Sequence, residues 1–170
     1  MSLAATIGKL PAWKLAQIVA AGSLLTILGA LGFQYIGGLP PCPLCLTQRI
    51  AYYAAILGGL LALLVLRAGR RRLAGLILAV IGFGLIYNVG LGVYHSGIEW
   101  KWWPGPLTCT GTQAVSTDAG SLLDKLNKMH VVRCDEAAFR FLWLSMAGWS
   151  ALISLSLGLA SLRAAVLAAR

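Results

Sequence analysis

Residues 44–66 read LCLTQRIAYYAAILGGLLALLVL, an apolar run in which Arg49 is the only charged residue. A helix needs about 20 predominantly apolar residues to cross a bilayer, so this run predicts a transmembrane helix. Runs of similar length and character occupy residues 15–36, 73–94 and 139–162. The sequence therefore predicts an all-α membrane protein in which four transmembrane helices form a bundle, organised as a single domain over residues 1–170.

The composition supports a membrane protein over a soluble one. Charged residues make up 11% of the chain and hydrophobic residues 59%, with a mean hydropathy of +0.81, whereas soluble domains carry roughly 25% charged residues. The net charge of +9 could indicate a nucleic-acid partner, but the basic residues lie at the ends of apolar runs and form no polar stripe. We therefore expect membrane lipid, and no nucleic acid, around this chain.

The lysines and arginines of the connecting segments predict the orientation, since cytoplasmic loops carry an excess of both. The turn at residues 37–41 contains neither, and the long segment at residues 95–138 mixes basic residues with all five acids. The basic residues that mark the opposite side are Lys9, Lys14, Arg67, Arg70, Arg71, Arg72, Arg163 and Arg170. Both termini are expected in the cytoplasm, and the short turn and the long loop are expected outside.

All four cysteines fall on this predicted outer side, where disulfides persist; they are Cys42, Cys45, Cys109 and Cys134. Cys42 and Cys45 flank Pro43, which suits the first position of a helix, and the amino end of a helix favours a thiolate. Arg49 follows Cys45 by four residues and therefore shares its helical face. A cation inside a membrane helix indicates a functional site, although Arg49 could also be an arginine that extends to the interface.

Other roles for the cysteines remain open at this stage. The C-x-x-C pair could be a static disulfide in a structural four-helix membrane protein, or half of a zinc site. Zinc needs two further ligands, and Cys109 and Cys134 are not spaced as a second C-x-x-C, so no metal is expected. A transporter is disfavoured because the spans other than Arg49 hold little charge. Redox chemistry is the favoured function.

The outer loop adds weaker signals. Residues 121–129 open with a capping pattern and carry one apolar stripe, which predicts a short helix on the membrane surface. A tryptophan cluster at residues 100–103 suits the headgroup region. His95 and His130 are expected to be ordinary interfacial side chains. Glycines inside the spans are either close-packing positions or simply a common feature of membrane helices; they include Gly58, Gly59, Gly82 and Gly84.

The order of these motifs resembles the bacterial disulfide-bond formation protein B (DsbB) family over most of the chain. The matching features are Cys-Pro-Leu-Cys at residues 42–45, the arginine four residues later, and a long loop with two cysteines. Arg-Cys-Asp-Glu at residues 133–136, Phe-Leu at 141–142 and Met-x-x-Trp at 146–149 also resemble the family. The related vitamin K epoxide reductase family has its loop pair before the C-x-x-C, which is the reverse of the order here.

The resemblance implies a quinone-dependent protein thiol oxidoreductase of the bacterial inner membrane, with its cysteines on the periplasmic side. Cys109 would form a mixed disulfide with a periplasmic thioredoxin-like thiol oxidase (DsbA-like), and Cys134 would resolve it. Cys42 and Cys45 would reoxidise the loop pair, with Cys45 facing a ubiquinone or menaquinone. The resemblance places three further residues at the quinone: Arg49, Gln48, which replaces an acid of some relatives, and Phe139, which replaces a tryptophan.

Overall fold

The computed structural model describes residues 10–106, 134–137 and 139–170. Its four long helices are α2 (Ala12–Tyr35), α3 (Pro43–Arg67), α4 (Arg71–Glu99) and α6 (Met146–Ala169). Each is long enough and apolar enough to cross a membrane, which confirms the predicted four-helix transmembrane bundle. The surface helix predicted at residues 121–129 lies outside the described residues.

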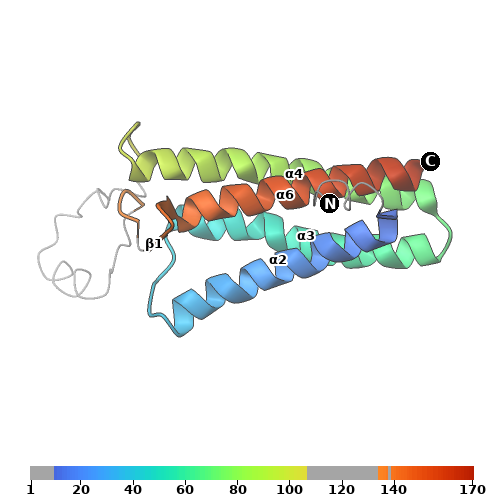
Figure 1. The fold of residues 1–170 in the computed structure, drawn as a ribbon, viewed down its shortest axis with the longest axis horizontal. Helices are drawn as coiled ribbons and strands as arrows, with labels where there is room; N and C mark the ends of the chain where they lie inside the picture. Colours follow the sequence, from blue (N-terminus) through green and yellow to red (C-terminus); the bar gives the residue numbers. More distant parts are fainter. Residues whose placement is uncertain (1–9, 107–133, 138) are drawn as a thin grey trace, which may run out of the picture.

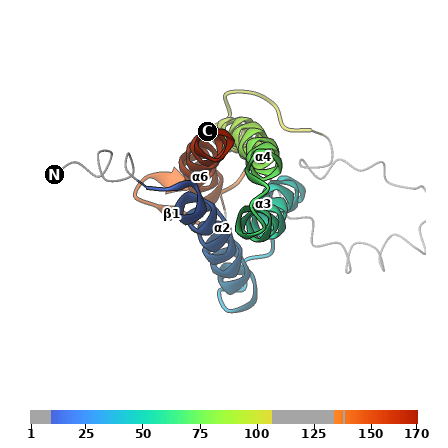
Figure 2. The ribbon, with the colours of Figure 1, turned by 90° about the vertical axis from the view of Figure 1, so that its right-hand side faces the viewer.

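The four helices form a ring in which α3 lies between α2 and α4, and α6 lies between α4 and α2 (Figure 2). The most extensive packing joins α4 and α6. The turn between α3 and α4 lies at the end of the bundle that also holds the C-terminus, and the connection from α2 to α3 lies at the other end (Figure 1). That second end carries Cys42, Cys45 and Cys134, so these three cysteines and the arginine-rich turn are separated by the length of the bundle.

Small residues allow the helices to approach closely. A Cβ atom added at Gly59 would lie 3.0 Å from Ala20 Cβ on α2, and one added at Gly82 would lie 2.6 Å from a methyl carbon of Leu162 on α6. A Cβ atom at Gly84 would meet nothing within 4 Å. The close-packing interpretation is therefore confirmed for Gly59 and Gly82 and is wrong for Gly84.

Gly92→Val is expected to destabilise the bundle by about 1–3 kcal/mol, the usual effect of overpacking. A Cβ atom at Gly92 would lie 3.1 Å from the Ala147 carbonyl oxygen, so the clash involves backbone that cannot rotate away. Thermal unfolding in detergent measures the effect. Gly90→Val is the matched control, because nothing lies within 4 Å of its Cβ position on the same helix; equal loss in both variants would contradict the packing argument.

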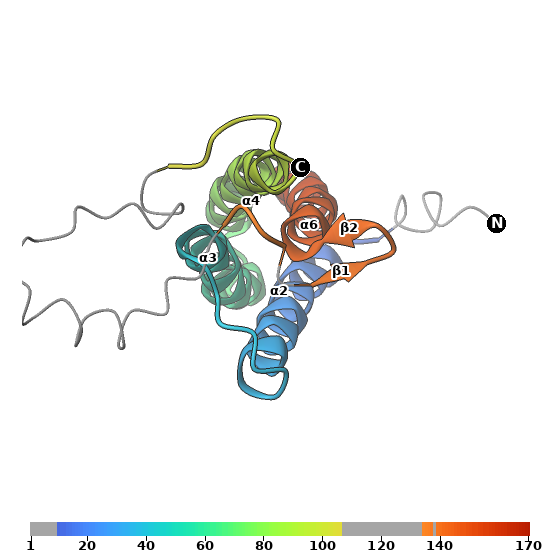
Figure 3. The same cartoon turned by 90° about the vertical axis from the view of Figure 1, so that its left-hand side faces the viewer.

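The fourth helix begins seven residues later than predicted, at Met146 instead of residue 139. The preceding residues form a short antiparallel hairpin of β1 (Arg140–Phe141) and β2 (Leu144–Ser145), which Figure 3 shows beside α2 and α6. The two residues between the strands, Leu142 and Trp143, have positive φ angles of 50° and 69°. Ser145 caps α6, since its Oγ accepts a hydrogen bond from Gly148 N at 3.2 Å. Hydropathy alone does not register such a cap.

The third helix extends five residues beyond the predicted end at residue 94 and stops at Glu99. This extension places His95 and Glu99 one helical turn apart, both buried in the bundle. The first helix begins at Ala12 instead of residue 15, because Pro11 occupies the N-cap position, and ends at Tyr35. The second helix differs from the prediction by one residue at each end.

Candidate functional site

Cys42 and Cys45 form a thiol pair at the amino end of α3. Cys42 is the N-cap residue, and its Sγ accepts a hydrogen bond from Cys45 N at 3.2 Å, with Pro43 in the first helical turn. The two Sγ atoms lie 2.8 Å apart, with the thiol of Cys42 donating to Cys45. This hydrogen bond, and then burial, raise the pKa of Cys42 above its ordinary value. The arrangement keeps the proton on Cys42 and presents Cys45 as the acceptor sulfur.

Cys134 packs directly against this pair. Cys42 and Cys134 are 4% and 1% exposed and share one buried cluster, to which Leu44 and Cys45 add partly buried side chains. Cys42 and Cys45 carry free thiols, whereas Cys134 is disulfide-bonded. Cys109, the other predicted loop cysteine, lies outside the described residues. The fold therefore brings a loop cysteine to the helix pair, which no spacing in the sequence indicates.

His95 lies at the centre of the site, so the expectation of an ordinary interfacial histidine is wrong. Its ring is almost fully buried, with Nε2 3.6 Å from Cys42 Sγ and Nδ1 3.1 Å from Gln48 Nε2. An amide nitrogen only donates hydrogen bonds, so with the Gln48 amide in this orientation Nδ1 accepts and the ring proton is on Nε2, within reach of Cys42. The backbone of Cys134 also lies within hydrogen-bonding reach of the ring. Gln48 is buried and orients His95.

Glu99 extends the site from the same helix. Its Oε1 lies 3.8 Å from His95 Nε2, and its side chain is 6% exposed. The carboxylate also bonds Ser145 at the head of α6, while its Oε2 has no hydrogen-bond partner within the described part of the chain. His95 and Glu99 continue a buried stripe on α4 that includes Asn88 and Gly92. This helical spacing of small and polar residues is the sequence signal that could have revealed both.

Arg49 faces the opposite neighbour, α2. One guanidinium nitrogen donates to Gln34 Oε1 at 2.7 Å and the other to the Ala30 carbonyl oxygen at 3.4 Å. Phe139 packs on Phe33, the neighbour of Gln34 in α2, with ring centroids 5.5 Å apart. Of the three residues predicted at the quinone, two therefore lie toward α2 and the third, Gln48, lies toward α4.

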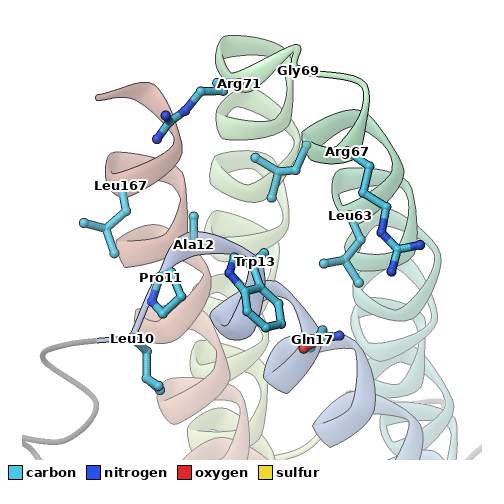
Figure 4. Close-up of a pocket in the computed structure, with 11 residues that line it drawn as sticks. Leu10, Pro11, Ala12, Trp13, Gln17, Leu63, Arg67, Gly69, Arg71 and Leu167 are labelled. Carbon is cyan, nitrogen blue, oxygen red and sulfur yellow. The ribbon is translucent and has the colours of Figure 1, made fainter.

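Two cavities lie away from the cysteines. One, of about 730 Å³, lies at the arginine-rich end, where Figure 4 shows Trp13, Arg67 and Arg71 around it. The other, of about 470 Å³, is an apolar groove between α3 and α4 that includes Ala54 and Gly58. These α3 positions lie on the side of the helix away from Arg49, given its 100° rotation per residue. Neither cavity includes a cysteine.

Comparisons with known proteins agree on one family. The family profile described as "Disulfide bond formation protein DsbB" matches residues 13–164. The chain is 32% identical over 148 residues to the disulfide bond formation protein B of Saccharophagus degradans, covering 85% of this chain and 87% of the relative. It is 32% identical over 142 residues to that of Marinobacter nauticus, covering 79% and 78%. None of the solved structures matches the chain at a significant level.

Proposed function

Because the chain belongs to the disulfide bond formation protein DsbB family, we propose that it reoxidises a periplasmic thioredoxin-like dithiol oxidase (DsbA-like) and passes the electrons to a membrane quinone. Membership of this family identifies the chain as a membrane oxidoreductase that acts in disulfide bond formation. The electron acceptor, the partner and the roles of individual residues are the proposed parts.

The observation that carries this proposal is the contact between Cys134 and Cys42. When the loop disulfide is reduced by a partner dithiol, the Cys134 sulfur lies where it can attack Cys42 in an oxidised Cys42–Cys45 pair. The attack forms a Cys134–Cys42 bond, breaks the Cys42–Cys45 bond and releases Cys45 as a thiolate. A second attack, by Cys109 on Cys134, restores the loop disulfide and leaves both electrons on the helix pair.

His95 and Gln48 assist at Cys42 in this scheme. The Nε2 proton of His95 faces Cys42 Sγ, so the ring can donate a hydrogen bond to that sulfur when it leaves as a thiolate. A charge-assisted hydrogen bond of this kind is stronger than one between neutral groups. Gln48 fixes the orientation of the ring from the other side. Its role is thus at the thiol pair, which differs from the quinone contact that the resemblance implied.

The residues on the α2 side of Cys45 fit a quinone. Cys45 is only partly buried, Arg49 is held over Gln34, and the rings of Phe33 and Phe139 are about 40% exposed beside them. A bound ubiquinone or menaquinone supplies an acceptor for two electrons and two protons. Arg49 offers it a fixed positive charge in a partly desolvated place, and the exposed aromatic rings offer it an apolar surface.

The proposal is tested with the purified full chain, a reduced thioredoxin-like dithiol oxidase and a water-soluble quinone. We expect one quinone to be reduced for each disulfide formed in the partner, and Cys42→Ser to abolish the reaction. A structural membrane protein with static disulfides would oxidise no partner in this assay. If the partner is oxidised at the same rate without quinone, the proposal that quinone is the electron acceptor is wrong.

The proposed compartment has its own test. The loop charges predict that the arginine-rich turn lies inside and residues 121–129 outside, so reporter fusions at Arg71 and Ser121 are expected to report opposite sides of the membrane. A fusion at Arg71 that reports the outer side would remove the cysteines from the compartment in which disulfides form.

A further inference from the structure

We propose that the reduced Cys42–Cys45 pair, together with His95 and Glu99, forms a site for a thiophilic divalent cation such as Zn²⁺, and that the bound cation holds the pair in its reduced form. The binding site stands on the geometry alone. Its inhibitory consequence rests on the proposed function, because it assumes that the same pair must be oxidised in every turnover.

The first three donor atoms are already grouped as ligands. Both Sγ atoms and a ring nitrogen of His95 lie within 4.8 Å of one another. Zinc binds sulfur at about 2.3 Å and imidazole nitrogen at about 2.0–2.1 Å, so a tetrahedral centre separates the two donors by about 3.6 Å. The distance between Cys42 Sγ and His95 Nε2 is 3.6 Å. The ring therefore stands where a shared metal ion requires it.

The two sulfur atoms need a small adjustment. A tetrahedral centre separates two thiolates by about 3.8 Å, whereas the Sγ atoms lie 2.8 Å apart. Cys45 is only partly buried, so a rotation of its side chain can open the pair by the required amount. The opening replaces the hydrogen bond between the sulfurs with two metal–sulfur bonds and releases the thiol protons of both cysteines to solvent; no electrons are transferred.

Glu99 supplies a fourth donor. Its Oε1 lies 3.8 Å from His95 Nε2, close to the spacing of two ligands on one zinc ion, and its Oε2 lacks a hydrogen-bond partner within the described part of the chain. A carboxylate oxygen that is buried without a partner is costly, and a cation beside it removes that cost. The C-x-x-C pair by itself lacks two zinc ligands, and α4 provides both.

Gln48 lies where an outer contact to a metal-bound His95 would be. A metal on His95 Nε2 requires the ring proton on Nδ1, which metal-bound histidines usually donate to an oxygen acceptor. Gln48 Nε2 now faces Nδ1, and a half-turn of the amide would present its oxygen there instead. A carboxylate at this position would accept the Nδ1 proton directly. Gln48→Glu is therefore expected to tighten metal binding by about tenfold, the scale of such outer contacts.

The cation selects one redox state of the protein. Thiolates bind zinc, whereas a disulfide offers neither thiolate. Zinc should therefore bind the reduced pair, withdraw the lone pairs of both sulfurs from attack, and stop quinone reduction. Exchange between a partner and the loop disulfide does not need the helix pair and should continue for a single turnover.

Co²⁺ is the probe for the experiment, because tetrahedral thiolate-bound cobalt absorbs visible light. The full chain is purified in detergent, reduced at all four cysteines, freed of quinone, and titrated with Co²⁺. We expect one Co²⁺ per chain with thiolate charge-transfer bands, displaced by Zn²⁺ and absent after the cysteines are oxidised.

His95→Ala should weaken Co²⁺ binding by more than about 100-fold, since loss of a ligand exceeds loss of its outer contact. His130→Ala, at the other histidine of the chain, is the matched control and should bind normally.

Glu99→Gln and Gln48→Glu preserve the size of the side chain. A change in Co²⁺ affinity in either variant is therefore not caused by misfolding. Cobalt bands that are unchanged in His95→Ala, or a spectrum typical of six oxygen ligands, would overturn the site. If Co²⁺ binds as expected but saturating Zn²⁺ leaves quinone turnover unchanged, the inhibitory consequence is wrong. A chain that binds Co²⁺ through His95 but never reduces quinone would retain the metal site and contradict the proposed function instead.

Discussion

Cys134→Ala is expected to accumulate a mixed disulfide between Cys109 and the partner oxidase and to lower turnover by about 10³-fold or more, the scale on which enzymes lose activity with an essential nucleophile. The physical reason is the contact of Cys134 with Cys42. Without that sulfur, nothing carries electrons from the loop to the helix pair, and the partner remains bound at Cys109. The variant is mixed with the partner in its disulfide form, so that the Cys109 thiolate attacks the partner disulfide, forms the mixed disulfide and releases the second partner thiol. Non-reducing electrophoresis detects the complex.

Cys109→Ala is the matched control, because it removes the other loop cysteine. It should lose turnover equally but trap no partner, since in the proposed scheme Cys109 is the residue that forms the mixed disulfide. If Cys134→Ala traps nothing and still oxidises the partner at the normal rate, the loop cysteines are a static disulfide and the electron path must bypass them.

Arg49→Ala is expected to weaken quinone binding by about 30-fold, which corresponds to about 2 kcal/mol for a charge at a partly desolvated site. Arg49 is held by Gln34 and by the Ala30 carbonyl, so its position would be fixed before a quinone binds. Arg49→Lys keeps the charge but loses the planar fork, and an intermediate affinity is expected. Steady-state kinetics with varied quinone concentration measures the change.

Two comparisons separate Arg49 as a quinone ligand from Arg49 as an interfacial arginine. Gln34→Ala removes one hydrogen bond to the guanidinium, and it should raise the KM for quinone by less than about tenfold, as expected for about 1 kcal/mol. Arg67→Ala, at the other end of α3, should leave that KM unchanged. Exchange between the loop disulfide and the partner should survive in all four of these variants, including Arg49→Ala and Arg49→Lys. Normal quinone affinity in Arg49→Ala would place the quinone elsewhere in the bundle.

The second helix illustrates what local sequence determines well. Pro43 and the preceding cysteine define its start, and the apolar run defines its end, so the prediction is within one residue at both termini. The fourth helix illustrates the opposite case. Residues 139–144 are apolar enough to continue a helix, but Ser145 caps α6 and the residues before it turn back as a hairpin. A short stretch of hydropathy does not distinguish these outcomes, because hydropathy registers neither a helix cap nor a turn.

The site residues also fall into two groups: those whose relation follows from local sequence and those whose neighbours are decided by the bundle. Arg49 and Cys45 share a face of one helix, and that relation follows from the helical period alone. The family resemblance placed Gln48 at the quinone beside Arg49, yet one residue is a rotation of 100° about the helix axis, and Gln48 faces His95 on α4. Which neighbouring helix lies on each side of α3 is a property of the bundle.

The sequence by itself determined the number of membrane helices, the C-x-x-C pair at a helix start and the arginine one turn later, because hydropathy and helical period act over short distances. Only the tertiary structure decided that Cys134 lies on Cys42, and that His95 and Glu99 lie beside the same sulfur. Those contacts depend on the packing of α4 against α3 and α6, where glycines such as Gly82 and Gly92 set the separation of helices. Such packing sums many weak contacts between distant segments, so no local pattern in the chain contains it.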